Sequence, residues 1–161
     1  MQDLQHRQKQ QITNEEDFLW PDRDNTFRAI VYREGGFVVV NMEDLDTANQ
    51  VRARNLVDLV GLDRHQERGW PDITDRDCRW EDREKVWKYA ERMRDKFPAP
   101  SPDDASVIAE GASFIGFFSV WMTVFREVPL VRQHLIRSFR GTSISCFNAL
   151  GDPQLRSGGR M

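Results

Sequence analysis

The longest apolar run of the chain covers residues 105–125, where Glu110 is the one charged residue. At about 100° per residue, one face of a helix over this run carries bulky side chains: Val107, Ile108, Phe114, Ile115, Phe118, Trp121, Met122 and Phe125. The opposite face carries small ones: Ala105, Ala109, Ala112, Gly116, Ser119 and Thr123. The preceding Ser-Pro-Asp-Asp offers a capping serine, a first-turn proline and two carboxylates at the positive helix end. The pattern predicts one helix over 102–126.

A helix that is apolar on all sides is either enclosed by protein or inserted in a membrane. A membrane span needs about 20 apolar residues, and 106–125 reaches that length if Glu110 is tolerated. We favour an enclosed helix of a soluble protein and keep the membrane span as the alternative. The small face should pack closely against another element. We therefore expect Gly116→Leu to destabilise the protein by overpacking, and Gly116→Ala to be near neutral or stabilising if there is room for a methyl group.

Two β-rich runs, FRAIVYR at 27–33 and FVVVNM at 37–42, flank the turn sequence Glu-Gly-Gly. This arrangement predicts a β-hairpin. A two-stranded hairpin is marginally stable alone, so it must pack on further strands or on the central helix.

Three more helices are indicated by periodicity and by start and stop signals. The first covers 45–60 and ends at Gly61, the second covers 82–97 with an apolar aromatic face, and the third covers 129–140 between Pro129 and Gly141. The predicted fold class is α+β: an N-terminal β-hairpin or small antiparallel sheet packed with about four helices, one of them central and apolar. We expect a disordered tail at 1–14, a single domain at 15–141 and a flexible C-terminal tail at 142–161.

Composition fits a soluble globular chain, with 161 residues, 39% hydrophobic and 30% charged. The net charge of −3 is divided unevenly: from Arg126 onward six Arg face two acidic residues, net +4, so residues 1–125 carry −7. The two cysteines, Cys78 and Cys146, provide no disulfide framework. The N-terminus has no apolar run typical of a secretory signal. We expect a cytoplasmic protein, with inner-membrane association as the alternative.

Acidic side chains and one histidine are concentrated in the stretch 62–78. Carboxylates with a histidine can bind a divalent metal or perform acid–base chemistry. The spacing matches no EF-hand and no paired zinc-ligand motif. We therefore predict no catalytic residue, metal site or cofactor, and keep as weak catalytic candidates His65, Glu67, Asp72 and Asp75.

The predicted function is binding. A chain of this size has few helices with which to enclose an all-apolar helix, and surplus apolar surface usually contacts a partner. The basic helix at 129–140 adds positive charge. The candidate partner-binding residues are Phe114, Phe118, Trp121, Arg132, Arg137 and Arg140.

We expect a small non-enzymatic accessory, adaptor or inhibitor protein that binds a protein partner or forms a homo-oligomer. One alternative is a nucleic-acid-binding protein that uses the basic C-terminal segment. Another is a metal-dependent hydrolytic enzyme built on the 63–78 loop. A membrane contact through 106–125 also stays open.

Overall fold

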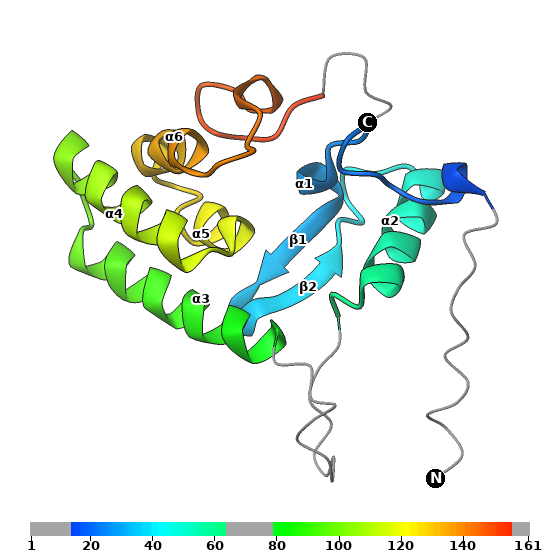
Figure 1. The fold of residues 1–161 in the computed structure, drawn as a ribbon, viewed down its shortest axis with the longest axis horizontal. Coiled ribbons are helices and arrows are strands. Elements are labelled where there is room, and N and C mark those ends of the chain that lie inside the picture. Colours follow the sequence, from blue (N-terminus) through cyan, green and yellow to red (C-terminus); the bar gives the residue numbers. More distant parts are fainter. Residues whose placement is uncertain (1–13, 64–78, 156–161) are drawn as a thin grey trace, which may run out of the picture.

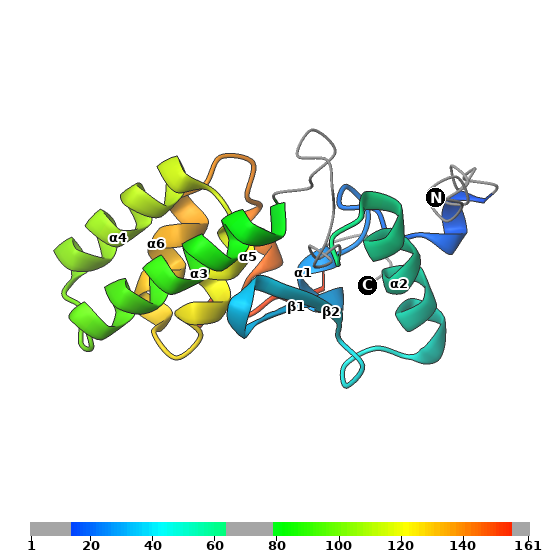
Figure 2. The ribbon, with the colours of Figure 1, turned by 90° about the horizontal axis from the view of Figure 1, so that it is seen from below.

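The computed structural model of this chain describes residues 14–63 and 79–155. Within these ranges it holds six α-helices and a two-stranded antiparallel sheet, which confirms the predicted α+β class. The hairpin lies between the single helix α2 and a group formed by α3, α4, α5 and α6 (Figures 1 and 2). The elements are α1 (Thr26–Ala29), β1 (Ile30–Arg33), β2 (Phe37–Val40), α2 (Thr47–Val60), α3 (Arg79–Lys96), α4 (Pro102–Ile115), α5 (Phe118–Val124) and α6 (Pro129–Ser138).

The predicted helix boundaries are largely confirmed by capping interactions. The Asp46 carboxylate accepts a hydrogen bond from the Asn49 backbone at the start of α2, and Gly61 ends that helix in the left-handed conformation. Ser101 and Asp104 form a capping box at the start of α4. Helix α3 begins at Arg79, three residues before the predicted start. Local sequence signals therefore fix most of the helix ends.

The hairpin turn is attached to α3. The strands pair from Ile30 opposite Val40 to Arg33 opposite Phe37. A Cβ atom on Gly36 would lie 2.8 Å from a backbone nitrogen of α3, so glycine is required there. The buried Arg83 of α3 donates through Nε to the Gly36 carbonyl at 2.9 Å. The described residues provide no third strand, and helices cover the hairpin instead.

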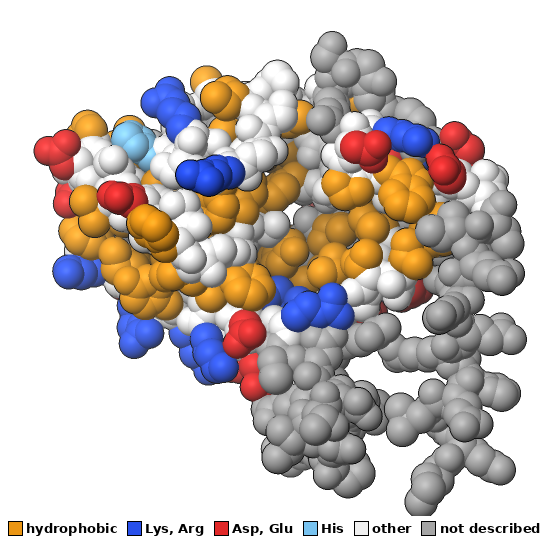
Figure 3. All heavy atoms as spheres, in the orientation of Figure 1, with side chains coloured by type: hydrophobic (Ala, Val, Ile, Leu, Met, Phe, Trp, Pro, Cys, Tyr) orange, Lys and Arg blue, Asp and Glu red, His pale blue; other side chains and the backbone are white. Residues whose placement is uncertain are grey.

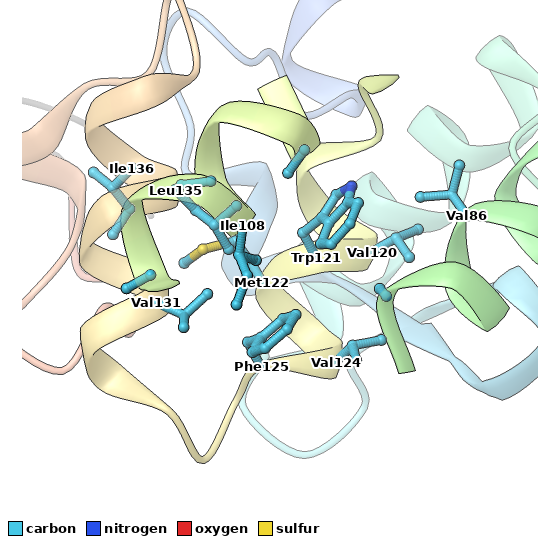
Figure 4. Close-up of a cluster of buried hydrophobic side chains, with 14 of the residues drawn as sticks. Val86, Ile108, Val120, Trp121, Met122, Val124, Phe125, Val131, Leu135 and Ile136 are labelled. Carbon is cyan, nitrogen blue, oxygen red and sulfur yellow. The ribbon is translucent and has the colours of Figure 1, made fainter. Parts of the chain in front are cut away.

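Two hydrophobic clusters make up the core. The larger one is formed by side chains of α3, α4, α5 and α6, which point toward one another around Trp121, Met122 and Phe125 (Figure 4). The smaller one joins Leu19 to the hairpin and α2. Tyr32 of β1 packs against both clusters, so the sheet is the structural connection between them.

The predicted helix over 102–126 is wrong as a single element, because the chain breaks after Ile115. Gly116 has φ 89° and ψ −160°, a region open almost solely to glycine. Phe117 follows in the left-handed conformation, with φ 59° and ψ 47°. The indole nitrogen of Trp121 donates to the Gly116 carbonyl at 3.1 Å and holds the break. The central apolar run is therefore two helices, α4 and α5.

Helix α4 buries its small face and exposes much of its bulky face. Ala105, Ala109 and Ala112 have no exposed surface, and α4 packs mainly against α6. Close packing of Ala109 and Ala112 is as expected, but nothing lies within 4 Å of a Cβ built on Gly116. The reason for glycine at position 116 is its backbone conformation and not a tight neighbour. Across the described ranges, no helix combines the length and the apolar character that a membrane crossing requires.

Residues 142–155, the described part of the segment predicted as a C-terminal tail, fold back onto the domain. Arg132 of α6 donates through Nη2 to the Gly151 carbonyl at 2.6 Å and through Nη1 to Asp152 at 2.7 Å. Asn25 donates to the Gln154 carbonyl at 2.6 Å. Phe147 contacts the ring of Phe27 at a centroid distance of 5.7 Å. These contacts join the C-terminal segment to both α6 and the N-terminal part of the chain.

The break at Gly116 gives a stability prediction. Gly116→Ala should lower the free energy of unfolding by about 1–3 kcal/mol, because alanine is strained at this backbone conformation. The matched control is Gly111→Ala, on the same helix with open space around a new Cβ. That change should raise stability by about 1 kcal/mol, through helix propensity. Urea unfolding measures both variants, and equal effects of the two substitutions would contradict the assigned break.

The pairing of Arg132 with Asp152 gives a pH prediction. The hydrogen bond from Arg132 lowers the pKa of Asp152, against an opposing effect of partial burial. A lowered pKa means that the pair stabilises the folded state fully above the ordinary aspartate pKa of about 3.9, and that this stabilisation is lost as pH falls through the folded value. At pH 6 the free energy of unfolding of wild type should exceed that of Asp152→Asn by about 1 kcal/mol. The value is modest because the carboxylate is half exposed.

The difference between wild type and Asp152→Asn should disappear on acidification below pH of about 3. Urea unfolding at a series of pH values measures it. Asp58→Asn, which removes an exposed carboxylate of α2, controls for loss of one charge. An advantage of wild type over Asp152→Asn that grew on acidification would contradict the pairing.

Candidate protein-binding surface

The structure separates the six predicted partner-binding residues into surface and interior positions. Phe114 is 85% exposed on α4, the most exposed large apolar side chain of the described residues. Arg137 and Arg140 are exposed at the end of α6. Trp121 is 1% exposed and Arg132 6%. Phe118 is half-buried. The six residues therefore do not form one surface.

The large exposed apolar residues of α4 and one glycine form a stripe, which we name the α4 outer face: Val107, Gly111, Phe114 and Ile115. These positions follow the spacing i, i+4, i+7 and i+8 of one helical face. The exposed fractions are 62% for Val107 and 43% for Ile115, and Gly111 has no neighbour near its Cβ position. The stripe is opposite Ala105, Ala109 and Ala112, which contact the core. Its exposure follows from burial of the small face.

The charges beside the α4 outer face are acidic. Asp103 and Glu110 are exposed on the same helix, and α4 carries no basic residue. The hydrogen bond from the Ser101 side chain lowers the pKa of Asp104 at the helix start. Hydrophobic side chains gather over α4 and its border with α3 in the space-filling view (Figure 3). On α4 itself the apolar stripe is bordered by carboxylates, and basic side chains lie further along the same side of the molecule (Figure 3).

Phe118 and Trp121 have structural contacts. The ring of Phe118 meets Phe139 at 5.0 Å and Phe27 at 5.2 Å between centroids. Trp121 meets Tyr89 of α3 edge-on at 5.9 Å between centroids, and it stacks on Phe125 at the end of α5. The two aromatic side chains join α5 to its neighbours and leave little surface for a partner.

Arg132 is also committed within the chain, through its bonds to Gly151 and Asp152. Arg132 therefore does not contribute to the predicted basic surface of the C-terminal segment. Among the described residues, the arginines that remain exposed there are Arg126, Arg137 and Arg140. Arg137 and Arg140 have no ion pair within the described ranges. Basic side chains lie beside hydrophobic ones over α6 and the C-terminal segment (Figure 3).

The weak catalytic candidates His65, Glu67, Asp72 and Asp75 lie outside the described residues. In the two ranges that the structure covers, no group of three His, Cys, Asp or Glu side chains could hold a metal ion. A depression of about 220 Å³ beside α1 includes Asp24 and Asn25 in its lining. The Asp24 carboxylate accepts hydrogen bonds from the Trp20 backbone and from Arg52, and Asn25 binds backbone carbonyls. Both polar groups have structural partners.

Sequence reasoning missed two exposed apolar sites. The first site consists of Val107 and Ile115 on α4, which an enclosed helix would bury. The spacing of Ala105, Ala109 and Ala112 had already indicated that the other face of this helix packs against the core. The second site lies on the C-terminal segment. Ile144 and Leu150 are 63% and 55% exposed on the C-terminal segment. No sequence periodicity indicates their position.

Comparison of the chain with protein-family models, with curated proteins and with solved structures finds no match.

Proposed function

We propose that this chain is a small non-enzymatic accessory protein that acts by binding a protein partner through the α4 outer face. The observation that carries the proposal is the 85% exposure of Phe114 in a stripe with Val107 and Ile115. Exposed apolar side chains that occur singly need no explanation, whereas a contiguous stripe of them is typical of an interaction surface. The free thiol of Cys146 fits a reducing compartment, and a cytoplasmic location is part of this proposal.

The stripe has the geometry of a helix that inserts into a hydrophobic groove. Such helices use apolar anchors at i, i+3 or i+4, and i+7. Phe114 is the natural anchor, because full burial of a phenylalanine side chain contributes about 1.5–3 kcal/mol. Gly111, between Val107 and Phe114, lets the partner approach the helix backbone closely. Because no described residue lies within 4 Å of a Cβ atom built on Gly111, no packing among the described residues accounts for the missing side chain.

The charge distribution supports a protein partner over a nucleic acid for this face. Asp103 and Glu110 border the stripe, and carboxylates repel phosphate groups. Burial of Arg132 also leaves the C-terminal segment with less exposed positive charge than its sequence indicates. The nucleic-acid alternative therefore rests on Arg126, Arg137 and Arg140 among the described residues.

The proposal is tested first by crosslinking in cells of the native host. A photoreactive phenylalanine analogue replaces Phe114 in one variant and Met42 in the control, since Met42 is 62% exposed on a different part of the surface. Crosslinking to one protein from position 114 and not from position 42 is the expected result. A crosslink to a second copy of the chain would identify a homodimer. Absence of any specific adduct at position 114 would contradict the proposal.

A substitution then separates binding from folding. Phe114→Ser should weaken binding to the purified crosslinked partner at least tenfold, measured by calorimetry. It should change the free energy of unfolding by no more than about 0.5 kcal/mol, because the side chain is exposed. Met42→Ser should leave both quantities unchanged. Equal affinity of Phe114→Ser and wild type would show that the α4 outer face is not the binding surface.

A further inference from the structure

A second surface feature lies on other elements, between α6 and the C-terminal segment. It is a depression of about 290 Å³ lined by Gln133, Ile136, Arg137, Ile144, Phe147, Asn148 and Ala149. Ligand pockets for drug-sized molecules have volumes of about 300–1,000 Å³. The depression is therefore at the lower limit for a cofactor, and its size suits one or two side chains of a partner.

The lining of the depression is largely apolar. Ile136 is 5% exposed and belongs to the main core, and Phe147 packs partly against the same core. Ile144 is 63% exposed, and Leu150 follows the lining residue Ala149 with 55% exposure. A buried aliphatic residue, an aromatic ring and exposed aliphatic side chains together favour an apolar side chain as the occupant.

One lining residue carries a positive charge that no described acidic residue pairs with. Arg137 is part of the lining, and Arg140 lies three residues further along the chain. Neither has an ion pair within the described ranges. The acidic residue of the C-terminal segment, Asp152, is held by Arg132 and Asn148. This local charge is opposite in sign to the net charge of −3 of the whole chain.

The walls of the depression are fixed before any partner binds. Gln133 of α6 donates from its side-chain amide to the Ala149 carbonyl, which joins the two walls. Arg132 holds the next turn of the segment through Gly151 and Asp152. A site that is ordered beforehand loses less conformational entropy on binding, so a short partner segment can bind measurably.

We propose that this depression receives one bulky apolar side chain from an acidic segment of a partner protein. The apolar side chain lies against Ile136 and Phe147, and carboxylates on either side of it pair with Arg137 and Arg140. Arginine presents a planar guanidinium that binds carboxylates through paired hydrogen bonds. The site uses α6, Arg140 and residues 144–149, so it does not share residues with the α4 outer face.

The test uses three short peptides with blocked ends and the full chain labelled with ¹⁵N. The probe is Asp-Asp-Leu-Asp-Asp; one control replaces Leu by Ser, and the other replaces every Asp by Lys. The probe should cause saturable shifts of backbone amide signals in residues 133–137 and 144–149. Its affinity should exceed that of each control at least fivefold. Shifts of equal size with the Ser or the Lys peptide would overturn the proposal.

Variants locate the binding. Arg137→Gln combined with Arg140→Gln, and separately Ile144→Ser, should each weaken probe binding at least fivefold with the amide spectrum otherwise retained. The matched control is Arg126→Gln, which removes an exposed arginine at the opposite end of α6 and should not change the affinity. Unchanged affinity in the double arginine variant would overturn the proposal.

Two further results would also reject this site. Probe-dependent shifts confined to residues 107–115 would move the acidic segment to the α4 outer face. A fluorescein-labelled oligothymidine that shifts the same amides as the probe, with higher affinity and the same loss in the double arginine variant, would identify a nucleic acid as the ligand.

Discussion

The arrangement of the helical half of the protein depends on the chain break at Gly116 and Phe117. A continuous helix would place Phe114, Phe118 and Trp121 on one face, all inside or all outside. The break separates them: Trp121 enters the core, and Phe114 stays in water. The indole nitrogen of Trp121 donates to the Gly116 carbonyl, so the residue that fills the core also fixes the break. One hydrogen bond thus links the main core to the exposure of the α4 outer face.

Three arginine side chains each hold a segment that is distant in sequence, by donating hydrogen bonds to its backbone carbonyl groups. Arg52 donates to Phe18, Arg83 to Leu62, and Arg132 to Gly151. A guanidinium group can satisfy several carbonyls at once, since it has five N–H donors in a fixed plane. Charge counts taken from the sequence therefore overstate the basic surface of the chain. This applies most directly to the C-terminal segment, where Arg132 faces inward.

The sequence predicts those features that depend on neighbours in the chain. Ser101 capping α4, Gly61 ending α2 and the Gly-Gly hairpin turn were all predictable from local rules. The chain break at Gly116 was not predictable. A glycine at this position is equally consistent with a face of small residues on a continuous helix and with a positive φ angle. The return of residues 142–155 depends on Asn25 and Arg132, which are distant in sequence from their partners. Of the candidate binding residues, Phe114 was chosen for its apolar character; the spacing of the alanines indicated the packed face of α4, but not that the opposite face would lie in water.

The division of the core into two clusters has a consequence for how the molecule opens. The hairpin and α2 share one cluster, the four later helices share the other, and Tyr32 and Arg83 connect them. Phe27 and Asn25 add contacts to Phe118, Phe147 and Gln154, so either cluster can open separately only if all of these contacts yield first. The hairpin and α2 form the smaller unit, with fewer buried side chains. Transient opening of that unit would expose the valine-rich strand β2 while α4 and α6 stay folded, so the exposed stripe of α4 would keep its shape during partial unfolding.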